Sequence, residues 1–428
     1  MSDTTNKFCM ILLSFIFIVV IYISYKYSIY PFYSYMGYTF FELTFLKLLL
    51  ISIIPALLSI FLPKNLISIS DLLSYILYFQ VIVPSLTIPF YVLNDIDFSQ
   101  WFPYWFGIVS CYILMTYLSK FKTLKIDFEI NDKLGNLVIF SIIAMSFLVL
   151  ILSYKPDINL LMSTTTIDEL YSLRMDYRDQ NENVNIFARY FFSWDAKVLI
   201  PLLVILGIFY KNKVLIFIGV ISQLLIFSIN GQKSVVLGVL LAIGIYFLSK
   251  KDKSGYKLFY IISCSIILFV LLDLLLGIGV FSNIIVRRMF VVPGVLTSYY
   301  LDFYSSGIFH EYSDSFFSGI IEPQYSQTAA RVIGLIYFNR EELAANVNFF
   351  SAAYSNFGIV SVYIESIILC LMLYVIHSIG KKKDRAVYLS LFVTPIIALS
   401  DSALFTTILT NGIALATLVL FLLSKKNE

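Results

Sequence analysis

Residues 8–28 read FCMILLSFIFIVVIYISYKYS, an apolar run of 21 residues with one charge, Lys26. A helix of about 20 apolar residues is long enough to cross the hydrocarbon core of a membrane. No small-residue cleavage site follows the run, so we expect a retained membrane helix rather than a signal peptide. Similar runs follow at 43–62, 72–94, 101–119, 135–153, 196–210, 213–229, 234–249, 257–280, 352–376, 386–400 and 406–424. They predict an all-α polytopic membrane protein with about 12 transmembrane helices.

The composition agrees with this class and excludes several others. Of the 428 residues, 59% are hydrophobic and 13% are charged, which is more apolar surface than a soluble domain can bury. The four cysteines lie in apolar runs, which excludes a disulfide framework or a thiolate metal site in the polar segments. The basic residues form no continuous patch, so we expect no nucleic acid partner. No Pro/Ser-rich linker divides residues 1–428, which predicts a single membrane domain.

Lysine residues mark one side of the membrane. They gather in alternate connections between the apolar runs: Lys64; Lys120, Lys122, Lys125 and Lys133; Lys211 and Lys213; Lys250, Lys251, Lys253 and Lys257; Lys381, Lys382 and Lys383 with Arg385; Lys425 and Lys426. Cytoplasmic connections carry an excess of Lys and Arg. We therefore expect both termini in the cytoplasm. Two large extracytoplasmic loops are expected at 154–195 and 281–350.

The arginines have the opposite distribution. Seven of the eight lie in these two loops: Arg174, Arg178 and Arg189 in the first, and Arg287, Arg288, Arg331 and Arg340 in the second. A planar guanidinium suits two-pronged contact with phosphate or carboxylate, whereas any cation satisfies a topology preference. The distribution indicates an anionic ligand on the outer face. Arg174 and Arg178 are four residues apart and would share one helix face, suited to a diphosphate, although nearby acids could pair with them instead.

Four further cations are candidates for the same ligand. Arg287 and Arg288 lie at the outer end of an apolar run, where one of them is expected to extend to the headgroups. Arg331 could reach back to the membrane surface. Lys233 lies in the short outer turn at 230–234, where a cation opposes the topology preference, and we expect a second phosphate contact there. The predicted phosphate-binding set is Arg174, Arg178, Lys233, Arg287, Arg288 and Arg331.

Other charged residues have local explanations or lie within the apolar runs. Arg340 is next to Glu341 and Glu342, which predicts a local salt bridge. Asp273 and Glu365 fall in the outer halves of their apolar runs. Ionisable residues inside a membrane are costly and often functional, so we expect both acids to line a cavity below the outer surface.

For proton transfer the second loop offers Asp302, His310, Glu311, Asp314 and Glu322. His310 is the only histidine predicted on the outer side, and a base with a near-neutral pKa suits deprotonation of a sugar hydroxyl. We select His310, Glu322 and Asp302 as candidate catalytic residues. The only other histidine, His377, is too distant in sequence to complete a histidine-rich metal site.

Short motifs in the second half resemble bacterial O-antigen polymerases, the Wzy-type polymerases of oligosaccharide repeat units. They are GQKS at 231–234, RMFVVPG at 288–294, YYLDFY at 299–304, SDSF at 313–316, ANVNF at 345–349 and YSNFG at 354–358. Similarity by motif spans about 225–365. The paired RX10G pattern of that family is missing, because no loop arginine has glycine at the required spacing. The assignment of the arginines therefore rests on their positions.

The resemblance implies a GT-C-like membrane glycosyltransferase in the bacterial inner membrane, with a periplasmic active site. Such enzymes transfer a growing glycan from undecaprenyl pyrophosphate to the non-reducing end of a new lipid-linked repeat unit. Expected partners are undecaprenyl-pyrophosphate-linked oligosaccharides and a chain-length regulator protein. The segment 31–42 contains one acid, Glu42, so we predict no metal and no cofactor. The alternatives are a lipid-linked oligosaccharide flippase, which should carry cations deep within its spans, and an O-antigen ligase.

Overall fold

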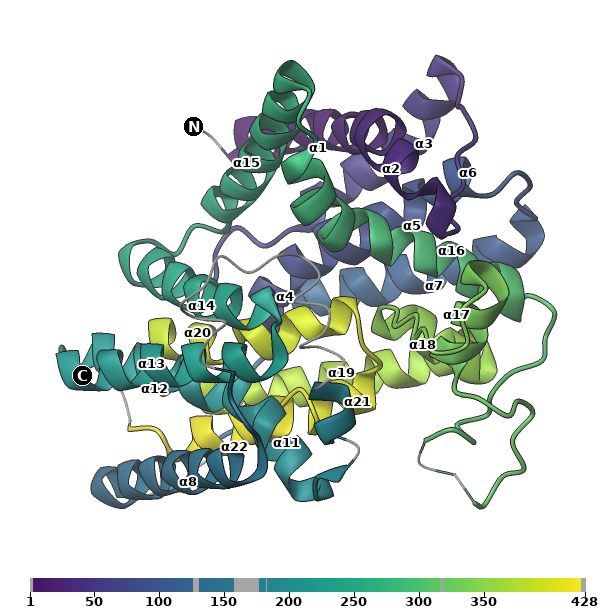
Figure 1. Ribbon diagram of the computed structural model, residues 1–428. Helices are drawn as coiled ribbons and strands as arrows, with labels where there is room; N and C mark the ends of the chain where they lie inside the picture. Colours follow the sequence, from purple (N-terminus) through teal and green to yellow (C-terminus); the bar gives the residue numbers. More distant parts are fainter. Residues whose placement is uncertain are drawn as a thin grey trace.

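The computed structural model describes residues 3–125, 131–157, 177–181, 183–315, 317 and 319–424. Within these ranges the chain forms helices and no strand (Figure 1). The helices are α1 (Asp3–Ser24), α2 (Tyr30–Tyr33), α3 (Phe45–Leu58), α4 (Ile69–Leu77), α5 (Val83–Thr87), α6 (Pro89–Val92), α7 (Phe98–Tyr117), α8 (Asp132–Ser153), α11 (Ile186–Trp194), α12 (Ile200–Phe209), α13 (Lys213–Asn230), α14 (Lys233–Lys251), α15 (Gly255–Leu276), α16 (Val292–Tyr304), α17 (Ala329–Phe338), α18 (Phe349–Phe357), α19 (Ile359–Gly380), α20 (Arg385–Ile397), α21 (Leu404–Leu409) and α22 (Ile413–Leu422).

Eleven helical stretches in the described ranges are long and apolar enough to cross a membrane. They are Asp3–Met36, Ile69–Thr87, Phe98–Lys120, Asp132–Ser153, Ile186–Phe209, Lys213–Asn230, Lys233–Lys251, Gly255–Leu276, Ser282–Tyr304, Ile359–Gly380 and Leu404–Leu422. The predicted class, an all-α polytopic membrane protein, is confirmed. Ten of the twelve predicted ranges coincide with these stretches. The other two, 43–62 and 386–400, form the shorter helices Phe45–Phe61 and Arg385–Ser400.

The one stretch without a predicted counterpart is Ser282–Tyr304. It lies at the start of the segment 281–350, which the sequence predicts to be a polar loop. It consists of a π-helical part, Ser282–Val291, that continues into α16. Gly277 ends α15 with φ +66°, and the buried carboxylate of Asp273 accepts hydrogen bonds from the backbone N–H groups of Phe281 (3.2 Å) and Ser282. Asp273 thus satisfies backbone donors at the start of this stretch, a role the prediction of a cavity-lining acid did not include.

Most of α16 is buried by other helices, and it packs against α5, α6 and α18. Figure 1 shows α16, α17 and α18 together at the right of the molecule, with the green segments 305–315 and 319–328 extending beyond them. The start of α1 and the end of α22 lie toward the left.

A buried polar network joins α7, α16 and α18. The Asn348 side chain donates to Thr297 Oγ1 at 2.8 Å and accepts from the backbone N–H of Ser351 at 3.2 Å. Ser351 Oγ lies 2.8 Å from the hydroxyl of Tyr104 and 3.1 Å from that of Thr297. Polar groups remote from water must be satisfied within the protein. The network therefore fixes where α18 begins, and α18 in turn supports the candidate site.

Candidate functional site

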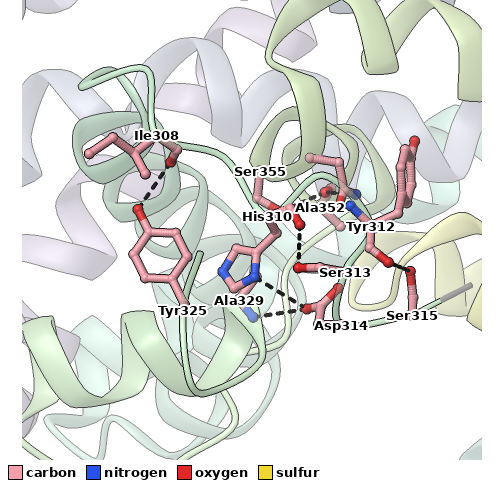
Figure 2. Close-up of polar contacts among 11 residues, drawn as sticks. Ile308, His310, Tyr312, Ser313, Asp314, Ser315, Tyr325, Ala329, Ala352 and Ser355 are labelled. Atoms are coloured by element: carbon pink, nitrogen blue, oxygen red, sulfur yellow. Dashed lines mark hydrogen bonds and ion pairs between the residues drawn. The ribbon is translucent and has the colours of Figure 1, made fainter. Parts of the chain in front are cut away.

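His310 is the centre of the candidate site and lies in the segment between α16 and α17. Its side chain is 1% exposed, stacks on Tyr325 with ring centroids 4.6 Å apart, and meets the edge of Tyr304 at 5.7 Å. Nδ1 lies 3.7 Å from Oδ2 of Asp314 (Figure 2). Within the described ranges neither ring nitrogen has a hydrogen bond. A carboxylate beside Nδ1 favours the tautomer protonated there, which leaves Nε2 as a base.

The turn that carries His310 is bound to the end of α18. The backbone N–H of His310 donates to the carbonyl of Ser355 at 2.9 Å, and that of Glu311 donates to the carbonyl of Asn356 at 3.1 Å. The N–H of Tyr312 donates to Asn356 Oδ1 at 3.1 Å. Glu311 and Tyr312 both have left-handed backbone, at φ +54° and +58°. Left-handed residues other than glycine are uncommon and cluster at functional sites.

Burial sets the protonation of His310. It lowers the pKa of the imidazole below its ordinary value, and the neighbouring Asp314 carboxylate partly opposes this effect. Desolvation disfavours the charged imidazolium, whereas a nearby negative charge favours it. The net lowering keeps His310 neutral near neutral pH. A neutral imidazole with a carboxylate at Nδ1 has the form required of a general base.

Asp314 also connects His310 to α17. Its Oδ2 accepts the backbone N–H of Ala329, the first residue of that helix, at 3.2 Å. A carboxylate at this position complements the positive end of the helix dipole. Arg331 lies in the first turn of α17, is exposed, and forms no hydrogen bond or ion pair through its side chain with the part of the chain that the structure describes. Of the predicted phosphate-binding residues, Arg331 is the one that follows, by two positions, the residue of α17 bound by Asp314.

Arg178 contacts the second polar segment just beyond α17. Its guanidinium donates to the carbonyl of Glu342 at 3.2 Å and lies 3.8 Å from the carboxylate of the same residue. Among the described residues, Glu342 therefore pairs with Arg178 and not with Arg340, so the local salt bridge predicted for Arg340 was wrong. Glu342 is close to Arg340 in sequence but pairs with Arg178, so nearness in sequence did not predict its partner.

Arg287 is half-buried and lies over the ring of Tyr33, with its guanidinium carbon 4.1 Å from the ring centroid. Its Nε donates to the carbonyl of Asn283 at 3.2 Å. The contact of Arg287 with the Tyr33 ring is a cation–π interaction, which leaves the guanidinium donors other than Nε available. Arg288, one residue later, is exposed. Ring contacts from Tyr33 through Tyr38 to Phe338 connect Arg287 to the end of α17.

Of the two remaining predicted cations, the structure describes Lys233 but not Arg174. Lys233 is exposed in the first turn of α14, directly after the left-handed Gly231 that ends α13. That end of α13 adjoins the first polar segment, because the N–H of Asp157 donates to the carbonyl of Ser228 at 3.2 Å. Arg174 falls outside the described residues.

The two other predicted catalytic acids have different surroundings. Asp302 accepts a hydrogen bond from the hydroxyl of Tyr337 at 2.5 Å, and burial followed by this carboxylate raises the pKa of Tyr337. The ring of Tyr337 stacks on Tyr299 with centroids 4.3 Å apart. Glu322 is exposed and has no hydrogen bond or ion pair to His310 or Asp314. The structure therefore joins His310 to Asp314, and neither Asp302 nor Glu322 forms such a pair with the imidazole.

Two site residues were not identified as such from sequence. Asp314 was one of five acids and bases considered, and its i,i+4 spacing from His310 was the available signal. Glu365 was expected to line a cavity. It is 2% exposed and accepts a hydrogen bond from the hydroxyl of Tyr312 at 2.8 Å, a contact that the sequence did not predict. Nothing in the local sequence connects residues 312 and 365.

The described residues include no group of three or more His, Cys, Asp or Glu side chains placed to hold a metal ion. No protein-family model, no curated protein and no solved structure was found to match the chain.

Proposed function

We propose that the protein is a membrane glycosyltransferase that polymerises lipid-linked oligosaccharide repeat units. It would transfer the growing glycan from undecaprenyl pyrophosphate to the non-reducing end of a new lipid-linked unit at the periplasmic face of the inner membrane. The observation that carries the proposal is the pair of the buried His310 and Asp314, which Asp314 connects to the first residue of α17, with Arg331 in the first turn of that helix. A base connected to the helix that also carries an unpaired cation suits transfer from a diphosphate leaving group.

The proposed reaction assigns a separate task to each group. Nε2 of His310 accepts the proton of the acceptor hydroxyl while that oxygen attacks the anomeric carbon of the donor glycan. The bond from the anomeric carbon to the diphosphate oxygen breaks, and its electron pair leaves with the lipid diphosphate. Negative charge then develops on the phosphate oxygens, where a guanidinium stabilises it. Loss of one preorganised donor of this kind typically reduces the rate about 100- to 1,000-fold.

The arrangement around α17 supports a binding region for a large anionic substrate. Arg331 is at one end of the helix, and Arg178 contacts Glu342 just after the other end. Aromatic side chains surround His310, and tyrosine faces can stack on sugar rings. Aromatic residues also gather at membrane interfaces, so the aromatic content supports a glycan ligand less strongly than the paired base and cations do.

The test is reconstitution of the purified protein with synthetic undecaprenyl-pyrophosphate-linked repeat units and EDTA, read on a glycan gel. A ladder of multiples of the repeat unit is expected, and it should be lost in His310→Gln. His377→Gln is the matched control, because His377 is the only other histidine and lies in α19 outside the candidate site. A normal ladder from His310→Gln would remove the histidine from the mechanism.

Absence of a ladder with folded wild-type protein and verified substrate would contradict the polymerase function. The same vesicles then distinguish the other classes. Transfer of glycan to added lipid A core would identify a ligase. Movement of the lipid-linked unit across the bilayer without any transfer would identify a flippase.

A further inference from the structure

Glu365 is a buried acid that the proposed reaction does not use. It lies in the second turn of α19, and one carboxylate oxygen accepts the hydrogen bond from Tyr312 at 2.8 Å. Its other carboxylate oxygen is buried and has no hydrogen bond with the described residues. A buried carboxylate is costly unless it is paired and hydrogen-bonded, and ionisable residues within membrane helices are commonly functional. Tyr312 follows His310 by two residues, so its hydroxyl connects Glu365 to the turn His310–Glu311–Tyr312.

That turn is strained and needs external support. Glu311 and Tyr312 are both left-handed, a conformation that is unfavourable for residues other than glycine. Backbone hydrogen bonds hold the turn to Asn356 at the end of α18. The hydroxyl of Tyr312 provides the anchor to α19, and its ring packs against Phe357 and Phe405 with centroids 5.7 and 6.2 Å away.

We propose that Tyr312 and Glu365 form a positioning pair for His310. Their hydrogen bond holds the left-handed turn in place and so keeps Nδ1 of His310 facing Asp314. The orientation of the base is thereby tied to the membrane helix α19. The proposal rests on the proposed function for the catalytic role of His310, but the position of the imidazole can be measured without any activity.

The first experiment observes His310 directly. The chain has two histidines, so in a His377→Gln background a 15N-histidine-labelled sample in nanodiscs gives signals from His310 alone. Its titration and tautomer are recorded for this parent and for Tyr312→Phe, which keeps the ring and removes the hydroxyl. Tyr312→Phe should move the titration midpoint and the tautomer ratio of His310. The charged group facing the imidazole is Asp314, and its ring neighbours are Tyr304 and Tyr325.

The matched control is Tyr374→Phe. Tyr374 lies in α19, the helix that carries Glu365, and donates its hydroxyl to the carbonyl of Lys122, outside the candidate site. Tyr374→Phe removes the same chemical group, a tyrosine hydroxyl, from a different contact of α19 and should leave the His310 signals unchanged. An equal change in both variants would overturn the proposal, because the effect would then be a general response of α19.

A second pair of variants separates the hydrogen bond from the charge. Glu365→Gln keeps an oxygen that can accept from Tyr312, whereas Glu365→Leu does not. Glu365→Leu should change the His310 signals as Tyr312→Phe does, and Glu365→Gln should change them less. If Glu365→Gln matches Tyr312→Phe, the negative charge and not the hydrogen bond controls the imidazole, and the positioning pair is overturned.

The polymerisation assay completes the test. Tyr312→Phe should lower kcat about tenfold with a smaller change in KM, because the substrate contacts remain. If wild-type protein gives no ladder while Tyr312→Phe still changes the His310 signals, the proposed function fails and the positioning pair stands. If wild-type protein polymerises and Tyr312→Phe changes neither the signals nor kcat, the positioning pair fails and the proposed function stands.

Discussion

The guanidinium of Arg178 donates a hydrogen bond of 3.2 Å to the carbonyl of Glu342, 164 residues later in the chain. The contact joins the two polar segments that contain seven of the eight arginines. Glu342 follows α17, whose first residue is bound by Asp314 and thereby connected to His310. One short helix therefore brings the first segment, a free cation and the buried histidine into a common region.

Arg178→Ala is expected to reduce polymerisation about 100-fold if the guanidinium binds the diphosphate. The free energy of unfolding should change by less than about 1 kcal/mol, because the Arg178 and Glu342 side chains are 40% and 82% exposed and such ion pairs are weak. Initial rates on the glycan gel and thermal unfolding of the same preparations test both statements. Glu342→Gln is the control and should retain activity. An equal loss in the two variants would make Arg178 a structural contact.

Arg331→Lys should impair polymerisation although it keeps the positive charge, because lysine cannot make a two-pronged contact with phosphate. Arg340→Lys is the matched control, since both arginines are exposed and flank the same helix. We expect a loss of at least about tenfold for Arg331→Lys and a mild effect for Arg340→Lys. Comparable rates for the two variants would place the diphosphate elsewhere.

The activity should depend on pH through His310. Because burial lowers the pKa of His310, the neutral base persists below the ordinary value, and the rate should fall only on the acid side of about pH 6.5. The folded protein binds this proton less readily than the unfolded chain does. Its contribution to the free energy of unfolding is therefore complete above about pH 6.5 and is lost as the pH falls toward the lower folded pKa.

Both statements can be checked by measuring rates and unfolding temperatures of the wild type and His310→Gln from about pH 4.5 to 8. Points about half a pH unit apart are adequate for a single titration. The variant should lose part of the acid destabilisation seen in the wild type. A wild-type rate that declines already on the alkaline side of neutrality as the pH is lowered would contradict a lowered histidine pKa.

Gly358→Ala should destabilise the protein by about 1–3 kcal/mol. Gly358 joins α18 to α19 at φ +60° and ψ −138°, and an added Cβ would lie 3.0 Å from Cζ of Phe309, next to His310. Gly277→Ala is the control. Its left-handed backbone at φ +66° also strains an alanine, but an added Cβ would meet nothing within 4 Å, so a smaller loss is expected. Thermal unfolding in one detergent compares them, and equal losses would show that contact with Phe309 is unimportant.

Helix Ser282–Tyr304 shows where prediction from hydropathy ends. Its first part contains Asn283, Arg287 and Arg288, which suggested a polar loop at a membrane boundary. The helix forms because its other positions pack against α5, α6 and α18, so it need not be uniformly apolar. Helices that face lipid, such as α8, were found from sequence because their whole surface must suit hydrocarbon.

The sequence by itself determined the all-helical membrane class, ten of the long helices and the confinement of arginine to two segments. These features depend on composition along the chain and on the cost of placing polar groups in hydrocarbon. Only the tertiary structure decided that Asp314 faces His310, that Glu342 pairs with Arg178 and that Glu365 accepts from Tyr312. The last two contacts join residues 164 and 53 positions apart, and their formation depends on how α17, α18 and α19 pack. Packing between distant helices leaves no local signal in the residues that it brings together.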